Sequence, residues 1–419
     1  MPAKVTNTEQ DKVDRSVTSF KGLNTVVDPL KLDLSWLTQA DNVNITRSGA
    51  IRRMRGWHPK LSLTNCTGAY FTKDFQNLFV VDNGSLLSVD SDLATTVTLA
   101  TGLSTTAPCY FDEVNGQIFM SNGVDFWMIH GGVAVPWGIA NPDPPPAATA
   151  APGGTLDVGT YLIVCTLTAP SGLESSNSDV VVCQVTASNS RIDVTSIPQV
   201  NGYTTNVYVT ERDDSVFKLI ASNAGTDLSY VDNSYLGIDL PFWNTNQPRG
   251  TMPTYYGARM YTAEWYPNQD YTAIWRSLPF NAHHFDPGGE GILVPGQVLQ
   301  MRSSRETHFT ASEKLTQKGV GDVIIIGTER EIYSWDEDQL VLLASYGVIP
   351  GHNMLEHKTK LYFWTKRGLC RALPFENLHE STVSVPPGLS AAATVIEDDG
   401  TRRYAVAVQR GGAAFNPYD

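Results

Sequence analysis

The chain has 419 residues and a formal net charge of −13, and only 17% of its residues are charged. This balance argues against nucleic-acid binding over the whole surface, because such binding depends on Lys and Arg displacing counterions from phosphates. The sequence has no apolar leader after Met1 and no apolar run of about 18 residues, so we expect synthesis in a cytoplasm without a signal peptide or a membrane helix.

Turn-forming residues are plentiful, with 34 glycines and 24 prolines, and they favour an all-β protein. The five cysteines are odd in number and include no C-x-x-C pair. We therefore predict reduced and mostly buried thiols, and a bridge between Cys165 and Cys183 is the alternative.

The N-terminal region predicts an arm followed by a small hairpin. Residues 1–17 are polar and form the arm, and residues 30–43 could hold only a turn or two of helix. The Ser48-Gly49 turn then places two short strands face to face. Four arginines cluster on this hairpin in a chain that is otherwise acidic: Arg47, Arg52, Arg53 and Arg55.

We interpret these arginines as a contact with another subunit or with an adaptor protein, because the guanidinium fork pairs well with carboxylates. The alternative is a solvated basic edge that prevents the addition of further strands.

A hairpin pattern recurs along the chain. Residues 78–89 (LFVVDNGSLLSV) and 117–129 (QIFMSNGVDFWMI) each contain Asn-Gly between apolar runs, at positions 83 and 122, which are 39 residues apart. Residues 323–335 and 361–373 repeat a similar pattern around Thr328 and Thr365, which are 37 residues apart. A period near 40 residues is typical of β-propeller blades. We predict five to seven blades, built from residues 18–145 and 246–419.

A different pattern interrupts the repeats. Residues 141–154 (NPDPPPAATAAPGG) form a stiff Pro-rich hinge that cannot join a central strand. Short strands bounded by turn residues follow, and they predict a fibronectin type III-like β-sandwich inserted over residues 149–245. The strands are expected at residues 160–168, 180–186, 191–195, 205–210, 217–220 and 228–232.

Candidate chemical groups lack the spacing that catalysis or metal binding needs. His283 and His284 are adjacent, and we interpret them and the following glycine-rich residues 286–291 as a loop and turn without metal or phosphate. The carboxylates at 211–214, 336–338 and 398–399 fall in polar runs between strands. The tryptophans that fall mostly in strands are interpreted as packing between blades: Trp127, Trp137, Trp265, Trp275, Trp335 and Trp364. We expect no metal, cofactor or catalytic residue.

The opening segments resemble a known family. Residues 20–29 (FKGLNTVVDP), 40–49 (ADNVNITRSG) and 51–57 (IRRMRGW) are similar to the opening of tail stabilisation, or nozzle, proteins of short-tailed bacteriophages. Later segments look like landmarks of the same family, at residues 159–161, 171–175, 208–211, 327–330, 347–351 and 366–370.

The resemblance implies a virion tail protein that assembles as a homo-oligomeric, six-fold ring. Such a ring would extend the channel below the portal and adaptor, receive a needle, spike or fibres, and let genomic DNA pass without sequence-specific binding. Two other functions remain open. A propeller at the tail tip or fibre junction could attach fibres or bind a host receptor, and a propeller glycosidase would need two carboxylates about 5–10 Å apart near the propeller axis.

Overall fold

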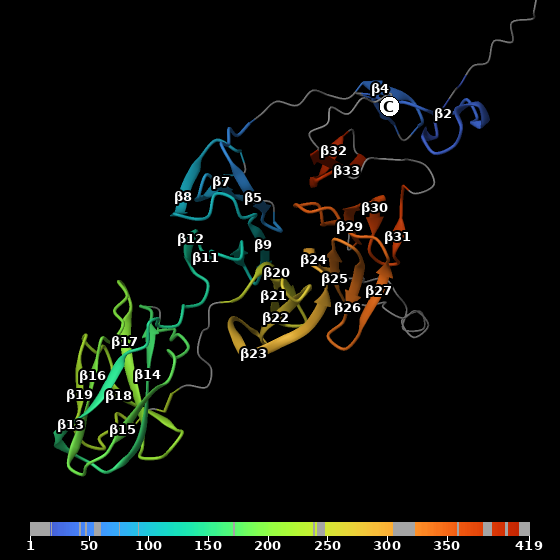
Figure 1. Ribbon diagram of the computed structural model, residues 1–419. Helices are drawn as coiled ribbons and strands as arrows, with labels where there is room; N and C mark the ends of the chain where they lie inside the picture. The colour runs from blue at the N-terminus through green and yellow to red at the C-terminus, as the bar shows by residue number, and fades with distance from the viewer. Residues whose placement is uncertain are drawn as a thin grey trace, which may run out of the picture.

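The computed structural model describes residues 17, 19–41, 43–46, 48–53, 60–74, 76–90, 92–170, 172–237, 239–240, 248–304, 323–357, 360–379, 388–398 and 401–409. Within these ranges the protein is all-β, as predicted, and its one helical element is the 3-10 turn η1 (Pro29–Lys31). No helix of the described part is long and apolar enough to cross a membrane. Figure 1 shows a group of sheets and a separate sandwich that projects from it.

Outside the insert, the described chain forms five four-stranded antiparallel sheets, and we call them blades 1 to 5 in chain order. Blade 1 contains β5 (Cys66–Phe71), β6 (Asn77–Asp82), β7 (Ser85–Asp90) and β8 (Thr96–Thr101). Blade 2 contains β9 (Tyr110–Val114), β10 (Gln117–Ser121), β11 (Phe126–His130) and β12 (Val133–Pro136). Blade 3 contains β20 (Thr251–Tyr256), β21 (Arg259–Tyr266), β22 (Tyr271–Leu278) and β23 (Asn281–Pro295).

Blade 4 contains β24 (Val298–Ser304), β25 (Val323–Thr328), β26 (Ile332–Trp335) and β27 (Leu340–Ala344). Blade 5 contains β28 (Leu355–His357), β29 (Lys360–Thr365), β30 (Gly368–Arg371) and β31 (Glu376–Asn377). In all five blades the strands pair in chain order, which is the up-and-down meander of a propeller blade.

The hairpin β32 (Ser390–Asp398) and β33 (Thr401–Gln409) occupies the position of a sixth blade. Its first strand joins blade 5 through backbone hydrogen bonds from Ala391 N to Pro350 O (2.9 Å) and from Ala393 N to His352 O (2.8 Å). The blade number therefore lies within the predicted five to seven.

Near the sixth blade lies the N-terminal hairpin β3 (Val43–Ile45) and β4 (Ile51–Arg53). Arg403 Nη2 on β33 donates to Ile45 O at 3.2 Å, although the two residues are 358 positions apart in the chain. The short strands β1 (Gly22–Leu23) and β2 (Trp36–Leu37) form a parallel pair before this hairpin. The two ends of the described chain thus meet on one side of the propeller (Figure 1).

Apolar residues collect between neighbouring blades, because each sheet has two faces to bury. One buried cluster joins blades 3 and 4 and includes Tyr261, Ile324 and Trp335. Separate clusters lie between blades 1 and 2, 2 and 3, 4 and 5, and 5 and 6. Trp137, Trp275 and Trp364 belong to these clusters, and Trp127 packs against one of them, which confirms the predicted packing role for these tryptophans.

The predicted repeat is visible in the turns between second and third strands. In blade 4, Thr328 Oγ1 accepts from Glu331 N (2.9 Å), and in blade 5, Thr365 Oγ1 accepts from Arg367 N (3.1 Å). In blade 1, Asn83 and Gly84 form the two-residue turn with positive φ values of 46° and 75°, as Asn-Gly predicts.

The second Asn-Gly pair behaves differently from the prediction. Asn122 lacks a positive φ, and its side-chain Oδ1 accepts from Val124 N (2.9 Å) and Asp125 N (2.6 Å). The turn is longer because an asparagine can close a loop with its side chain as well as with its backbone.

Two further expectations are corrected. His283 and His284 lie within β23, not in a loop, and residues 286–289 interrupt the pairing of that strand with β22 as a bulge instead of forming a turn. A bulge accommodates extra residues without ending the strand pairing. In the sequence, such glycine-rich extra residues resemble those of a turn. The helix expected within residues 30–43 is limited to the single turn η1, which begins at Pro29, because strand β2 follows shortly after it.

The insert is a two-sheet antiparallel sandwich, as predicted. One sheet pairs β13 (Ala147–Leu156), β16 (Ser190–Thr195) and β19 (Leu228–Tyr230). The other pairs β15 (Val181–Val185), β14 (Gly159–Thr168), β17 (Thr204–Thr210) and β18 (Phe217–Ala221) in that order. Its first two strands lie in different sheets, whereas the first two strands of an immunoglobulin domain share one. The hinge ends earlier than expected, since residues 147–154 join β13, an edge strand that tolerates Pro152.

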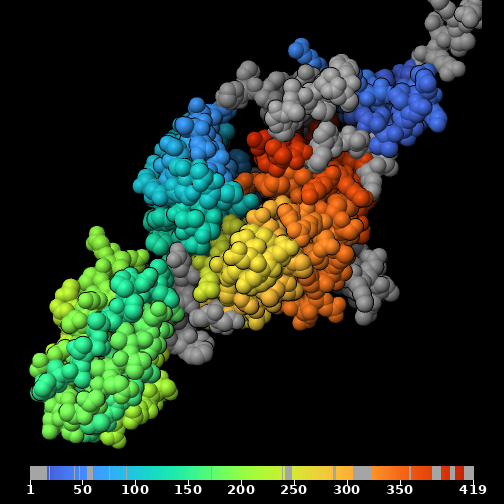
Figure 2. Space-filling model, viewed as in Figure 1, coloured from blue at the N-terminus to red at the C-terminus, as the bar shows by residue number. Residues whose placement is uncertain are grey.

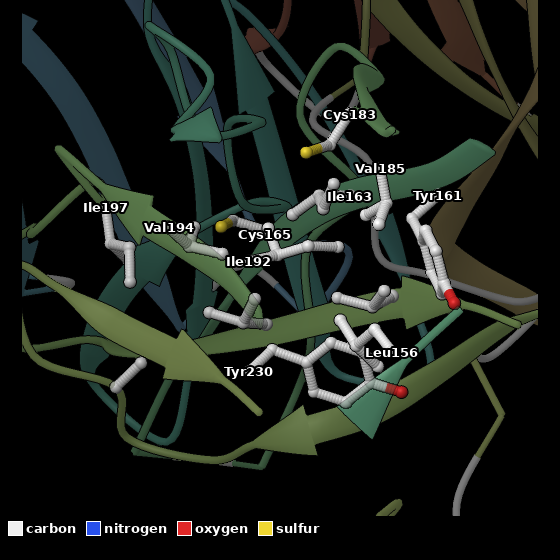
Figure 3. Packing of buried hydrophobic residues seen from close by; sticks show 13 residues of the cluster. Leu156, Tyr161, Ile163, Cys165, Cys183, Val185, Ile192, Val194, Ile197 and Tyr230 are labelled. Atoms are coloured by element: carbon white, nitrogen blue, oxygen red, sulfur yellow. The ribbon is translucent and has the colours of Figure 1, made fainter. Parts of the chain in front are cut away.

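The sandwich has a core of its own, built from residues 148–235 alone (Figure 3). Cys165 and Cys183 both lie in it as free thiols, so the alternative bridge is absent. Burial raises the pKa of the Cys165 thiol to about 12, which keeps it protonated at neutral pH. All five cysteines are free, and all except Cys66 are buried.

Deleting residues 147–240 and joining the ends with a short Gly-Ser linker should leave the propeller folded. The chain segments on either side of the insert already bind each other, because Ser121 Oγ donates to Gly250 O (2.7 Å) and Trp137 Nε1 donates to Ala282 O (2.9 Å). Circular dichroism and tryptophan fluorescence should show a cooperative β-sheet unfolding transition. Deleting blade 2 instead is the matched control and should abolish that transition. Loss of the transition in the sandwich deletion would show that the boundary is wrong.

Candidate functional site

The first strands of the six blades surround one cavity of about 630 Å³, which we call the axial cavity. It is lined by residues 69–73, 110–112, 252–253, 300–302, 351–357 and 393–396 and by Arg402. These segments belong to or directly adjoin the first strand of each blade: β5, β9, β20, β24, β28 and β32. Arg402 lies on β33. A cavity of this volume is in the range of small-molecule sites in proteins.

His352 lies near the end of the axial cavity where the first strands begin. Its ring is 4.6 Å from the ring of Tyr110 on blade 2, and its Nε2 is 3.4 Å from Thr67 O on blade 1. Burial lowers the pKa of His352, and the nearby positive charge of Arg302 lowers it further. The imidazole thus connects blade 5 with blades 1 and 2 in its neutral form.

Charged residues lie near the other end. Asp112 on β9 is buried, and its two oxygens accept from Glu113 N (2.8 Å) and Tyr255 N (2.6 Å). Lys73 Nζ is 3.9 Å from the Asp112 carboxylate. Glu356, the other carboxylate of the lining, is exposed. The Asp112 carboxylate therefore connects blades 2 and 3.

The middle of the axial cavity is polar on the side of blades 4 and 5. Gln300 on β24 is 3% exposed, and its Nε2 donates to Ile349 O at 2.5 Å. Asn353 Nδ2 donates to the same carbonyl (2.9 Å), and Asn353 Oδ1 accepts from Trp364 N (2.9 Å). Gln300 Oε1 is buried and has no hydrogen-bond partner within the described structure.

Tyr70 forms part of the opposite wall. Its ring stacks on Phe111 with centroids 5.8 Å apart, and its hydroxyl donates to Glu113 Oε2 at 3.3 Å. Burial raises the pKa of Tyr70 well above the usual value for tyrosine, while the charge of Arg302 acts in the opposite direction. Tyr70 is therefore a neutral hydrogen-bond donor.

The two described arginines of the predicted cluster, Arg52 and Arg53, do not line this cavity. Arg52 and Arg53 lie on β4, where Arg52 is half-buried and Arg53 is exposed. Arg47 and Arg55 fall outside the described residues, so the clustering of all four stays a prediction.

The other candidate groups are dispersed. The described part of the chain contains no group of three or more His, Cys, Asp and Glu side chains that could hold a metal ion. His283 packs edge-on against Phe119 at 5.5 Å, and burial lowers its pKa. Among the loop carboxylates, Glu337 accepts a hydrogen bond from Tyr261 on the neighbouring blade, and burial raises its pKa.

Sequence reading missed the residues of the axial cavity. Gln300, Arg302 and His352 belong to no motif, and each comes from a strand or loop that resembles its neighbours in composition. The signal that could have found them is positional, since the first strand of every propeller blade faces the axis.

No protein-family model matches this sequence, and no curated protein matches it either. Among solved structures, the chain is similar to a functionally unknown protein from Desulfotomaculum acetoxidans DSM 771, with 13% identity over 83% of this chain and 90% of that chain and a TM-score of 0.29. It is also similar to extracellular domains 1-2 of Drosophila Semaphorin 1a, with 11% identity, 73% and 85% coverage and a TM-score of 0.24. Likenesses at these TM-scores carry no argument about function.

Proposed function

We propose that this chain is a structural subunit of a bacteriophage tail, which assembles with copies of itself into a ring that extends the DNA channel below the portal and adaptor. The proposal rests on the resemblance of residues 20–29, 40–49 and 51–57 to nozzle proteins, and on the surface that this same region presents.

The surface of residues 19–53 is the observation that carries the proposal. None of the hydrophobic residues described in this segment is fully buried, and Leu30 is 94% exposed. Val26 and Leu34 are also at least half exposed. Figure 2 shows the segment, in blue, at the margin of the molecule. A segment with apolar side chains and no core of its own is typical of a surface that another chain covers.

A ring also gives the net charge of −13 a role. Heterologous contacts that return on themselves produce closed rings, and every copy adds its charge to the assembly. Carboxylates around the lumen would repel DNA phosphates at distances within about 8 Å at physiological salt. The DNA would then slide through without binding, and the far end of the ring would receive the needle, spike or fibre proteins.

Native mass spectrometry of the purified chain tests the proposal. We expect a closed ring, six-fold by the family resemblance, whose abundance falls strongly when Leu30 and Leu34 are both changed to Ser. Changing Arg52 and Arg53 to Ser should also weaken assembly, because buried interface carboxylates would lose their partners. The matched controls are Leu236→Ser and Arg212→Ser on the sandwich, which should assemble normally.

The variants must keep the β-sheet circular dichroism of the wild type for the comparison to hold. A wild-type chain that stays monomeric at all concentrations would contradict the proposal. So would an oligomer distribution that neither the leucine pair nor the arginine pair changes.

A further inference from the structure

The axial cavity contains a cation that has no partner among the residues that the structure describes. Arg302 lies on β24 and lines the cavity. Its side chain is half-buried, and it makes no hydrogen bond or ion pair with any residue that the structure describes. A charge that is partly removed from water is costly unless an opposite charge or hydrogen-bond acceptors surround it.

The carboxylates of the lining do not fill this role. Both carboxylate oxygens of Asp112 accept hydrogen bonds from backbone amides of blades 2 and 3. Within the described structure, the ion pair of Asp112 is with Lys73. Glu356 is exposed to solvent. As far as the described residues go, the guanidinium of Arg302 is therefore available to an anion from outside the chain.

A hydrogen-bond acceptor lies beside this cation. Gln300 and Arg302 are two residues apart on β24, so their side chains project from the same face of the strand. Because Gln300 Nε2 is held by Ile349 O, the orientation of the amide is fixed and Oε1 is left as a buried acceptor without a donor. Such an atom is costly to bury and indicates a missing partner that donates a hydrogen bond.

The remaining walls favour an organic molecule over a bare ion. The rings of Tyr110 and His352 and the side chains of Met252 and Met354 line the same space. A volume of about 630 Å³ exceeds what an inorganic anion needs. Apolar walls with a few convergent polar groups are typical of small-molecule sites.

We infer that the axial cavity binds a small organic acid that carries a carboxylate or phosphate for Arg302 and a neighbouring hydroxyl or amino group that donates to Gln300 Oε1. The anion would form the two parallel hydrogen bonds that a guanidinium fork offers. This inference is independent of ring formation, because the cavity lies within one chain.

Isothermal titration calorimetry on the full-length protein tests the inference with three probes. Gluconate carries a carboxylate and hydroxyls, glucose 6-phosphate carries a phosphate and hydroxyls, and sorbitol is the neutral counterpart. We expect gluconate or glucose 6-phosphate to bind, and which of them binds identifies the anion. Sorbitol should bind at least tenfold more weakly. Arg302→Gln should weaken binding of the acid at least tenfold, and Gln300→Leu should weaken it several-fold.

Two controls separate ligand binding from a structural role. Arg330→Gln, at an exposed arginine of blade 4, should bind as the wild type does. Without ligand, Arg302→Gln should melt at the same or a higher temperature than the wild type, because it removes an unpartnered charge. The inference is overturned if neither acid binds, if Arg302→Gln binds the acid normally, or if that variant melts at a lower temperature without ligand.

Discussion

Replacing Trp335 with Ala should lower the free energy of unfolding by about 3–5 kcal/mol. The indole on β26 is 1% exposed and meets the ring of Tyr261 edge-on, with centroids 5.4 Å apart. Blade 3 has adapted to it, since a Cβ added at Gly291 would lie 2.8 Å from Trp335 Cη2. Removing the indole leaves a cavity between two sheets that cannot move together without disturbing their own neighbours.

Urea unfolding followed by circular dichroism measures this effect. The matched control is Phe280→Ala, which removes an aromatic ring that is 90% exposed and should change stability by no more than about 0.5 kcal/mol. Trp335→Phe should fall between the two, because it keeps part of the buried ring. A loss below about 1 kcal/mol for Trp335→Ala would show that the contact between blades 3 and 4 does not stabilise the fold.

The blades were predictable from the sequence because their signals are local. Thr328 and Thr365 close equivalent turns with their own side chains, so the spacing of 37 residues reports one structural unit. Asn83-Gly84 likewise needs only the conformational freedom of its own backbone. Six of the seven described strands of the sandwich were predicted within a few residues for the same reason, whereas β13 overlaps the predicted hinge.

Features that depend on distant partners were not predictable. Asn122 is followed by a glycine, as Asn83 is, yet it forms an isolated β-bridge with Thr251. The chain reaches Thr251 only after the whole insert. The axial cavity is the extreme case, because segments from all six blades, far apart in the chain, contribute to it. In the sequence Arg302 is an ordinary strand residue, and only the arrangement of the blades around the cavity shows that it lines this space.

The N-terminal hairpin shows how a local prediction can be right and incomplete. The Ser48-Gly49 turn and the pairing of the two short strands on either side of it are as predicted. The sequence could not show that the hairpin would contact β33 through Arg403, because that contact joins the two ends of the chain. Whether Arg52 and Arg53 contact another subunit stays a prediction for the assembly experiment.

Lowering the pH from about 7 to 5 should destabilise the protein through its buried histidines. Burial lowers the pKa of His283, His284, His352 and His379 below the ordinary value of 6.5. At pH values between 6.5 and the lower pKa of each histidine in the folded chain, the unfolded chain binds more protons than the folded chain does. The free energy of unfolding therefore falls as the pH falls, by up to about 1.4 kcal/mol per pH unit for each fully shifted histidine.

The carboxylates whose pKa is lowered act in a lower pH window. Hydrogen bonds lower the pKa of Asp33, Asp74 and Asp193, so their contribution is present above the ordinary value of 3.8 and is lost only below it. Urea unfolding at pH 7, 6 and 5 therefore reports mainly on histidine.

His352 should account for a large share of this dependence, because its ring is enclosed by Tyr110 and blade 1 and lies near the positive charge of Arg302. His352→Gln should flatten the dependence of stability on pH between 7 and 5, even if the variant is less stable at every pH. His130→Gln, at an exposed histidine, is the control and should keep the wild-type slope. An unchanged slope in His352→Gln would mean that this imidazole is protonated in the folded chain, and that the end of the axial cavity where it lies is open to water.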